Sequence, residues 1–148
     1  MDVEKHFRRL EKMYLKSNVN QSLYESTEAL IESKKATISI EISEKYFHAL
    51  GAIHGSIYFK LLDDAAFFAA NSVVTDKFLL TSNFNISLVR PANKGKITAI
   101  GTLNFQSKNL FIASSSLLNE QGKEIAFGTG HFMKSQIDLT EEIGYHDE

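Results

Sequence analysis

The segment from His48 to Ser72, HALGAIHGSIYFKLLDDAAFFAANS, places two acidic residues inside a long apolar run that follows a glycine-containing turn. Residues 53–72 contain no proline and are too many for one ordinary strand, so they predict a central helix. A carboxylate in so apolar a setting is unfavourable unless it is paired or neutralised. Asp63 and Asp64 therefore mark the place where function is sought first.

Outside residues 48–72, most of the sequence pattern is typical of β-strands. Ala36 to Ile42 has isoleucines at every second position, which indicates a half-buried strand. Four longer strands are expected after the helix, at residues 81–89, 96–107, 109–119 and 123–134, and we expect them to form an antiparallel meander. Gly101, Gly128 and Gly130 fall within these strands and indicate bulges or a close backbone approach. One strand, one helix and four strands predict an α+β fold with the helix lying across the sheet.

An amphipathic helix is expected near the N-terminus, because Val3, Phe7, Leu10 and Tyr14 recur at helical spacing among charged residues. We expect it to cover the body of the protein. Residues 17–32 are polar and irregular, with room for a short second helix. Residues 1–148 are expected to form one domain, with an N-terminal helical segment (1–34), a core (35–135) and a C-terminal tail (136–148).

Composition narrows the class of protein. The formal net charge is −2, and no stretch gathers basic residues, which argues against a nucleic-acid partner. The chain has no cysteine, which excludes disulfides, thiolate catalysis and cysteine-bound zinc. No apolar run reaches the length of a membrane span, and the first residues do not form a signal peptide. We therefore expect no membrane association and a cytoplasmic location.

The order of elements, with His54-Gly55 at the start of the helix and Asp63 further along it, resembles the hotdog fold. In particular it resembles the phenylacetyl-CoA thioesterase-type branch of acyl-CoA thioesterases, whose helix reads HGG, an apolar stretch and then a catalytic Asp. Residues 85–95, NISLVRPANKG, resemble the next strand of that family and its proline-containing turn. The resemblance covers residues 36–134.

That resemblance implies an antiparallel sheet wrapped around a long central helix, with the N-terminal helix as an addition. It also implies an acyl-CoA substrate and active sites shared between subunits of a homodimer or a dimer of dimers, here written as a homotetramer. No separate cofactor is expected, since coenzyme A is part of the substrate.

Thioester hydrolysis needs a group that polarises the carbonyl and a base or nucleophile beside it. The free N–H of Gly55, at the positive end of the helix, can hold the developing oxyanion. Asp63 can activate a water or attack the carbonyl itself. Eight residues of helix separate the two by about 12 Å, too far to act on one carbonyl. We therefore expect Asp63 and Gly55 of one site to come from different subunits.

Other roles come from the resemblance alone. His48 stands where the family usually has Asn, and its imidazole can donate a hydrogen bond to the thioester oxygen or to a water, or can be a loop histidine without a chemical role. Thr81 falls where relatives carry a hydroxyl that orients the attacking water. Ser56 replaces the second Gly of HGG and narrows the site. His54 is expected to hold the turn by hydrogen bonding.

The substrate's phosphates require cationic partners, and several basic residues lie at strand ends or turns; these are Arg90, Lys94, Lys96 and Lys108. Three aromatic residues of the helix line an acyl pocket or belong to the core: Phe59, Phe67 and Phe68. Asp64 is either a structural acid, paired with a lysine such as Lys60, or a helper at the site. A metal site is not expected, because the spacing of His48, His54 and Asp63 matches no common zinc pattern.

The leading hypothesis is an acyl-CoA thioesterase. One alternative is a hotdog module that binds acyl-CoA without catalysis. Another is a dehydratase acting on 3-hydroxyacyl thioesters, which His54 and Asp63 keep open. The sequence leaves undecided whether the acyl group is aromatic or fatty, whether it is carried by coenzyme A or a carrier protein, and whether dimers pair into tetramers.

Overall fold

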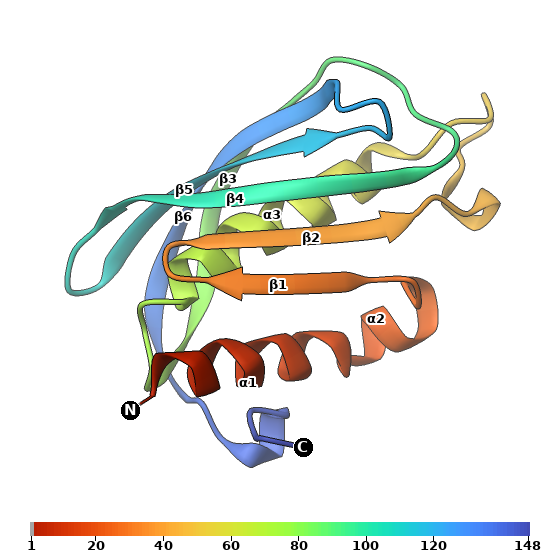
Figure 1. The fold of residues 1–148 in the computed structure, drawn as a ribbon. Helices are drawn as coiled ribbons and strands as arrows, with labels where there is room; N and C mark the ends of the chain where they lie inside the picture. Colours follow the sequence, from red (N-terminus) through yellow and green to blue (C-terminus); the bar gives the residue numbers. More distant parts are fainter. Residues whose placement is uncertain (1) are drawn as a thin grey trace.

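One antiparallel sheet curves around a 17-residue helix, α3, in the computed structural model, which describes residues 2–148 (Figure 1). The helices are α1 (Val3–Leu15), α2 (Asn18–Leu23) and α3 (Gly55–Asn71), with short 3-10 turns η1 (Glu44–Tyr46) and η2 (Glu141–Ile143). The strands are β1 (Glu28–Glu32), β2 (Lys35–Glu41), β3 (Lys77–Leu88), β4 (Lys96–Gln106), β5 (Leu110–Leu118) and β6 (Glu124–Asp138). The expected α+β arrangement around a central helix is confirmed.

The start of α3 and its seat on the sheet both follow from local sequence. His54 is the N-cap, and its Nδ1 accepts a hydrogen bond from the Ser56 N–H at 3.0 Å. Gly101 of β4 lies so close to the helix that an added Cβ would stand 2.1 Å from the Ala65 carbonyl oxygen. The glycine therefore allows the backbone of α3 to rest directly on β4, which is the close approach expected for this position.

The expectation of a simple meander is wrong. The strands lie in the order β1-β2-β4-β5-β6-β3. Strand β3 therefore pairs with β6 at one edge of the sheet and does not pair with β4, the next strand in the sequence. Among the four strands after α3, only β4, β5 and β6 follow one another as hairpins. The alternation of apolar residues indicates which face of a strand is buried, but it does not indicate which strands lie beside it. The sequence pattern therefore did not predict this crossover.

The sheet also has a strand that the pattern did not predict. Residues 28–32 form β1, inside the segment expected to be irregular, and pair with β2 through a tight turn at Lys34, whose φ is +64°. Ile31 is its one fully buried residue, so the apolar signal was weak. The short second helix is present as α2, and β6 runs three residues beyond the expected end of the core at 135.

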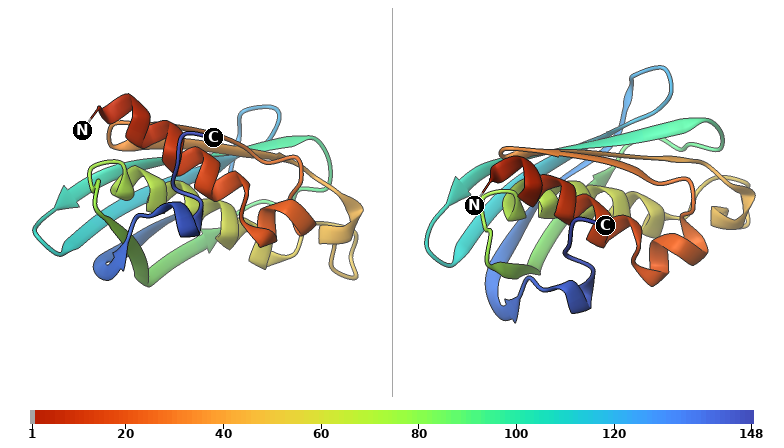
Figure 2. Two further views of the ribbon diagram at one scale, coloured as in Figure 1. Left: turned by 90° about the horizontal axis from the view of Figure 1, so that it is seen from below. Right: turned by 60° about the horizontal axis from the view of Figure 1, so that its bottom comes forward.

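Helix α1 lies along β1, as expected for a cover, and the C-terminal segment crosses beneath it (Figure 2). Phe7, Leu10 and Tyr14 are buried, whereas Val3 is 58% exposed and does not belong to the buried stripe. The β1 edge of the sheet is thus covered, while the outer edge of β3 has no strand beside it within residues 2–148. No helix in that range is long and apolar enough to cross a bilayer.

Candidate active site

Asp63 lies in the middle of α3 and faces β3. The Thr81 hydroxyl of β3 donates a hydrogen bond to Asp63 Oδ1 at 2.9 Å. Immediately after Thr81 the pairing of β3 with β6 is irregular, because Ser82 is an extra residue on β3. Bulges of this kind re-aim neighbouring side chains and are frequent beside active sites. The structure therefore brings together two of the predicted catalytic residues.

The carboxyl of Asp63 has unusual acid–base properties. Burial raises the pKa of Asp63 to about 6, and the nearby negative charge of Asp64 acts in the same direction. The hydrogen bond from Thr81 and the charge of Lys60 pull the pKa the other way without cancelling the effect of burial. A carboxyl that titrates close to neutrality can take up and release a proton during a reaction.

Asp64 is engaged in a different set of contacts. Its Oδ2 lies 2.6 Å from Lys60 Nζ and accepts a hydrogen bond from the Tyr14 hydroxyl at 2.7 Å. The Lys60 ammonium also lies 4.6 Å from the centre of the Tyr24 ring. Asp64 thus ties α3 to α1 as a structural acid, which was one of the two expected readings, and its role toward substrate stays a prediction.

A pocket of about 440 Å³ opens beside Asp63. Its walls come from α1, α2, α3 and β3, and they include Tyr14, Tyr24, Phe67, Phe68, Phe78, Leu80 and Thr81. Phe67 and Phe68 belong to the buried core and also line this pocket, so their place in an acyl pocket stays a prediction. Phe59 is 41% exposed and packs edge-on against Phe84. Tyr14, Tyr24 and Phe78 had not been predicted at the site, since nothing in the sequence links them to Asp63.

Gly55 lies in a second cleft, at the N-terminal end of α3. This cleft, of about 390 Å³, has walls that include His48, Gly55, Tyr58 and Arg90, and it shares no residue with the Asp63 pocket. Gly55 is the first residue of the helix, and within residues 2–148 its N–H has no hydrogen-bond acceptor. A donor at the positive end of a helix is suited to hold negative charge.

Three predicted residues around this cleft are held by local bonds. His48 Nδ1 accepts from the Leu50 N–H at 3.1 Å, in a turn where Gly51 has a φ of +79°. His54 Nδ1 caps the helix, and the Ser56 hydroxyl lies 2.9 Å from the same nitrogen. His54 therefore holds the turn, as expected. All three side chains His48, His54 and Ser56 are exposed.

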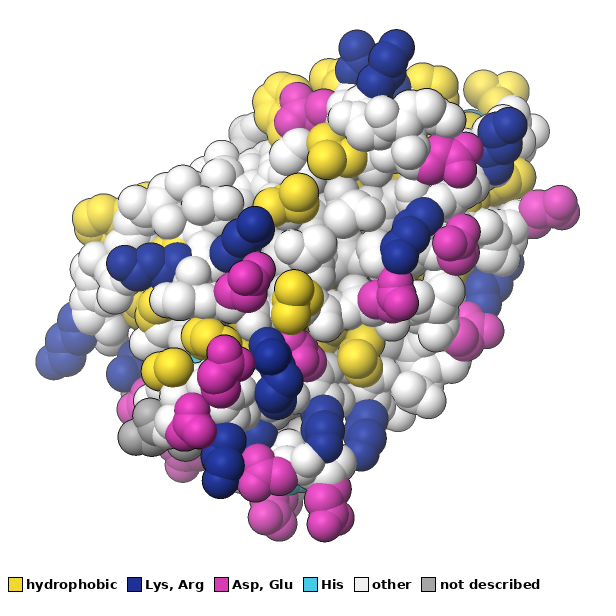
Figure 3. Space-filling view, viewed as in Figure 1, with side chains coloured by type: hydrophobic (Ala, Val, Ile, Leu, Met, Phe, Trp, Pro, Cys, Tyr) yellow, Lys and Arg dark blue, Asp and Glu magenta, His cyan; other side chains and the backbone are white. Residues whose placement is uncertain are grey.

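The predicted cationic residues are widely separated. Arg90 lines the Gly55 cleft and donates to the Glu124 carbonyl at 2.6 Å, whereas Lys96 is paired with Glu28 at 2.6 Å. Lys108 lies at the turn after β4, so the 11 residues of that strand, about 35 Å in length, separate it from Lys94 at the other end. Within one protomer the structure does not bring Lys108 to the Gly55 cleft. On the face shown in Figure 3, acidic and basic side chains are interspersed.

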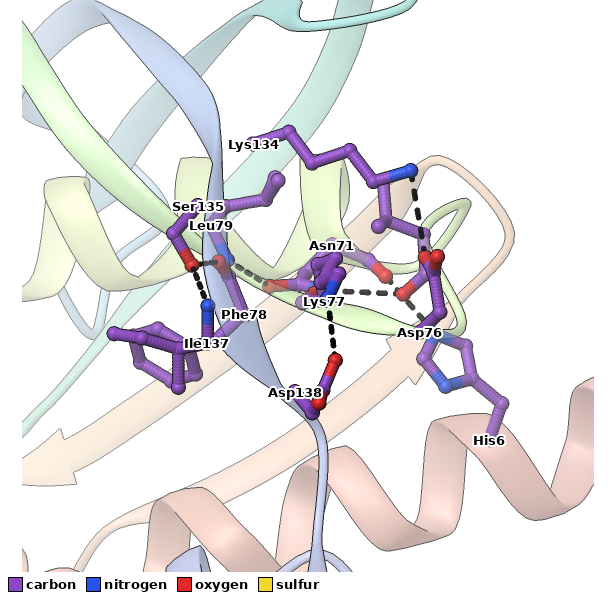
Figure 4. Close-up of polar contacts among 11 residues, drawn as sticks. His6, Asn71, Asp76, Lys77, Phe78, Leu79, Lys134, Ser135, Ile137 and Asp138 are labelled. Carbon is purple, nitrogen blue, oxygen red and sulfur yellow. Dashed lines mark hydrogen bonds and ion pairs between the residues drawn. The ribbon is translucent and has the colours of Figure 1, made fainter.

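Hydrogen bonds between side chains and the backbone fix the start of β3 (Figure 4). The Asn71 amide donates to the carbonyls of Val74 and Lys77 and accepts from the Leu79 N–H at 3.0 Å. The Ser135 hydroxyl contacts the Phe78 carbonyl. These bonds hold Phe78 against α3. Within residues 2–148 there is no cluster of three or more His, Asp or Glu side chains that could hold a metal ion.

Comparisons with known proteins agree with this architecture. The family model described as "Thioesterase superfamily" matches residues 50–126, from the turn before α3 into β6. No curated protein sequence is significantly similar to the chain.

Solved structures share the fold over most of the chain. The Escherichia coli PaaI protein from the phenylacetic acid degradation operon superposes with a TM-score of 0.83 at 21% identity, covering 93% of this chain and 99% of its own. A Thermus thermophilus protein gives a TM-score of 0.72 at 19% identity, with 81% and 99% covered. A Streptococcus mutans protein bound to acetyl CoA gives 0.68 at 17% identity, with 74% and 88% covered.

Proposed function

This chain belongs to the thioesterase superfamily, and on that premise we propose that it hydrolyses the thioester of an acyl- or aryl-coenzyme A at an interface between two copies of itself. The observation that carries the proposal is Asp63, a half-buried carboxyl with a pKa of about 6 that is oriented by Thr81 at the mouth of an apolar pocket. Ordinary structural acids in helices are seldom placed in this way.

The chemistry follows from these groups. Ionised Asp63 takes a proton from a water as that water attacks the thioester carbonyl carbon, and the carbonyl oxygen becomes an oxyanion held by the Gly55 N–H. When the intermediate collapses the carbon–sulfur bond breaks, the proton on Asp63 passes to the leaving thiolate, and a free acid and coenzyme A result. Direct attack by the carboxylate, followed by hydrolysis of the anhydride, gives the same products.

Two features support a site shared between subunits. The pockets of Asp63 and Gly55 are separate within one protomer, and about 12 Å of helix lies between them. The outer edge of β3, which carries Thr81, is open and bears the exposed apolar side chains of Leu80 and Leu88. Pairing of two copies along this edge would bring Asp63 of one toward Gly55 of the other. The homodimer, or a tetramer built from it, is part of the proposal.

Coenzyme A then belongs at the Gly55 cleft. Arg90 in its wall supplies a cation for the substrate's phosphates, and the exposed His48 lies in the same wall. His54 and Ser56 flank Gly55 in the sequence and are also exposed. The acetyl CoA held by the similar Streptococcus mutans protein supports a coenzyme A ligand. Lys108 contributes only if a second protomer brings its β4–β5 turn close.

The test is Asp63→Asn, with Asp64→Asn as the matched control. We expect Asp63→Asn to lower hydrolysis of a panel of acyl-CoAs, followed by release of free thiol, by at least about 10³-fold. Asp64→Asn makes the same chemical change at the next residue, and we expect it to lower the free energy of unfolding by about 1–3 kcal/mol while turnover continues.

Two results would contradict the proposal. One is hydrolysis by Asp63→Asn at the wild-type rate. The other is tight binding of acyl-CoA to the wild-type protein by calorimetry with no thiol released, which would identify a binding module without catalysis.

A further inference from the structure

A groove of about 620 Å³ lies next to the Asp63 pocket. The two cavities share four wall residues, Tyr14, Ser17, Phe68 and Phe78, so they meet along a common boundary. A ligand whose reacting carbonyl lies at Asp63 can therefore extend past Phe68 into the groove.

The groove is apolar along its walls and polar at its margins. Its apolar side chains are Met13 and Tyr14 of α1, Phe68, Phe78, Ile137 of β6 and Ile143 of η2. Ile137 is 46% exposed and Ile143 is 38% exposed. Lys16 and Glu142, which also line the groove, are exposed. Covering partly exposed apolar side chains with an apolar ligand is favourable in free energy, because it removes apolar surface from water.

Both ends of the chain build this groove, and most of its wall lies outside residues 50–126, the part matched by the family model. Helix α1 forms one side and the C-terminal segment forms the other, where Gly144 has a φ of +96° and lies so close to α1 that an added Cβ would stand 3.3 Å from the Met13 Cα. The groove therefore depends mainly on segments outside the part of the chain that the family model matches.

Polar contacts hold the two sides together. The buried His6 Nδ1 lies 2.7 Å from the Tyr145 hydroxyl, and the Arg9 guanidinium makes two hydrogen bonds to Asp147. Beneath the groove, the Ser135 hydroxyl contacts the Phe78 carbonyl and accepts from the Ile137 N–H at 3.0 Å (Figure 4). The walls are thus fixed before any ligand arrives.

We propose that this groove binds the aliphatic tail of the acyl group, so that the chain acts on thioesters of medium- to long-chain fatty acids. The proposal rests on the thioesterase function above. The Asp63 pocket alone accommodates a short or aromatic acyl group, whereas the groove adds a further cavity of about 620 Å³. A flexible apolar chain can reach from Asp63 past the wall residues that the two cavities share. It meets no buried charge in the groove, because Lys16 and Glu142 are exposed.

The experiment compares butanoyl-, octanoyl- and dodecanoyl-CoA. Each methylene that enters the groove should raise kcat/KM about fourfold, from ≈ 0.8 kcal/mol per buried methylene, until the groove is filled. Ile143→Trp places a large ring at the groove wall, and we expect it to lower kcat/KM for dodecanoyl-CoA by at least about tenfold with little change for butanoyl-CoA. Leu30→Trp, at an exposed position on β1 away from the groove, is the control.

A second measurement separates this proposal from the proposed function. Asp63→Asn should bind dodecanoyl-CoA more tightly than butanoyl-CoA by calorimetry, and adding Ile143→Trp should remove the difference. Equal hydrolysis of all three thioesters, unchanged by Ile143→Trp, would overturn the acyl groove and leave the thioesterase intact. Binding that depends on chain length and on Ile143, without any hydrolysis by the wild type, would keep the groove and overturn the catalytic function.

Discussion

Asp63 and Gly55 lie on one helix, yet their surroundings differ in kind. Asp63 is half-buried, hydrogen-bonded to Thr81 and beside a pocket whose aromatic residues come from α1, α3, β3 and the end of α2. Gly55 lies in a separate cleft whose walls include the exposed side chains of His48 and Arg90. The carboxyl of Asp63 has its raised pKa within a single chain. The Gly55 N–H, in contrast, has no hydrogen-bond acceptor within residues 2–148.

The difference indicates which half of the site the proposed second subunit would complete. The pKa of Asp63 is already raised to about 6 in the isolated protomer, so a partner is not required to tune it. The Gly55 cleft lacks an acid within reach, since Asp63 belongs to a separate pocket. In the proposed dimer, the partner completes this cleft by supplying its Asp63. Under this proposal, the Asp63 half of the site is already formed in one protomer, whereas the Gly55 half needs a second protomer.

Gly55→Pro is expected to cause the largest loss of kcat/KM among the changes that test the proposed role of the Gly55 N–H. Proline removes the N–H and is well tolerated at the first position of a helix. His54 already has φ −65° and ψ 149°, the region favoured before proline. We expect kcat/KM to fall by about 10²–10³-fold, with the circular dichroism spectrum unchanged.

Gly55→Ala is the control for that change, because it adds a Cβ and keeps the N–H. The new Cβ would lie 3.3 Å from the flexible Leu88 side chain, so a small adjustment accommodates it. Equal losses in the alanine and proline variants would show that crowding, rather than the missing donor, is responsible.

Mixing two inactive variants tests whether the halves come from different chains. Random exchange between Asp63→Asn and Gly55→Pro subunits gives heterodimers in half of the population, each with one intact site if the site is shared, so about a quarter of wild-type activity should return. If each chain held a complete site, no mixture would regain activity. Thiol release after subunit exchange in mild denaturant measures the outcome.

The sequence predicts these two halves unequally well. Gly55 and Asp63 belong to one continuous helical segment, so their separation follows from helix geometry alone. Tyr14 and Phe78 reach the Asp63 pocket from remote segments, and no local pattern links them to it. The position of β3 at the sheet edge is set by which strand it pairs with, and alternation along a strand carries no such information.

Burial of the Asp63 carboxyl should also make the free energy of unfolding depend on pH. The pKa of Asp63 is raised in the folded state, so between about pH 4 and pH 6 the folded chain holds a proton that the unfolded chain has lost. Stability from this group is therefore present at low pH and is lost as the pH rises through about 6. We expect Asp63→Asn to be more stable than wild type by about 1–3 kcal/mol at pH 8 and equal to it near pH 3 in urea unfolding. A variant less stable than wild type at pH 8 would contradict this account.

The smallest effect concerns Thr81, whose hydrogen bond lowers the pKa of Asp63. Thr81→Val keeps the shape and removes the hydroxyl, so the pKa of Asp63 should rise further and the acidic limb of the kcat/KM profile should move to higher pH. Near pH 6 the variant should be about three- to tenfold slower than wild type, and at pH 8 the two rates should converge. Thr81→Ser, which retains the donor, should follow the wild-type profile. A loss in Thr81→Val that persists undiminished at pH 8 would instead mean that the hydroxyl orients the attacking water, because full ionisation of Asp63 could not restore that role.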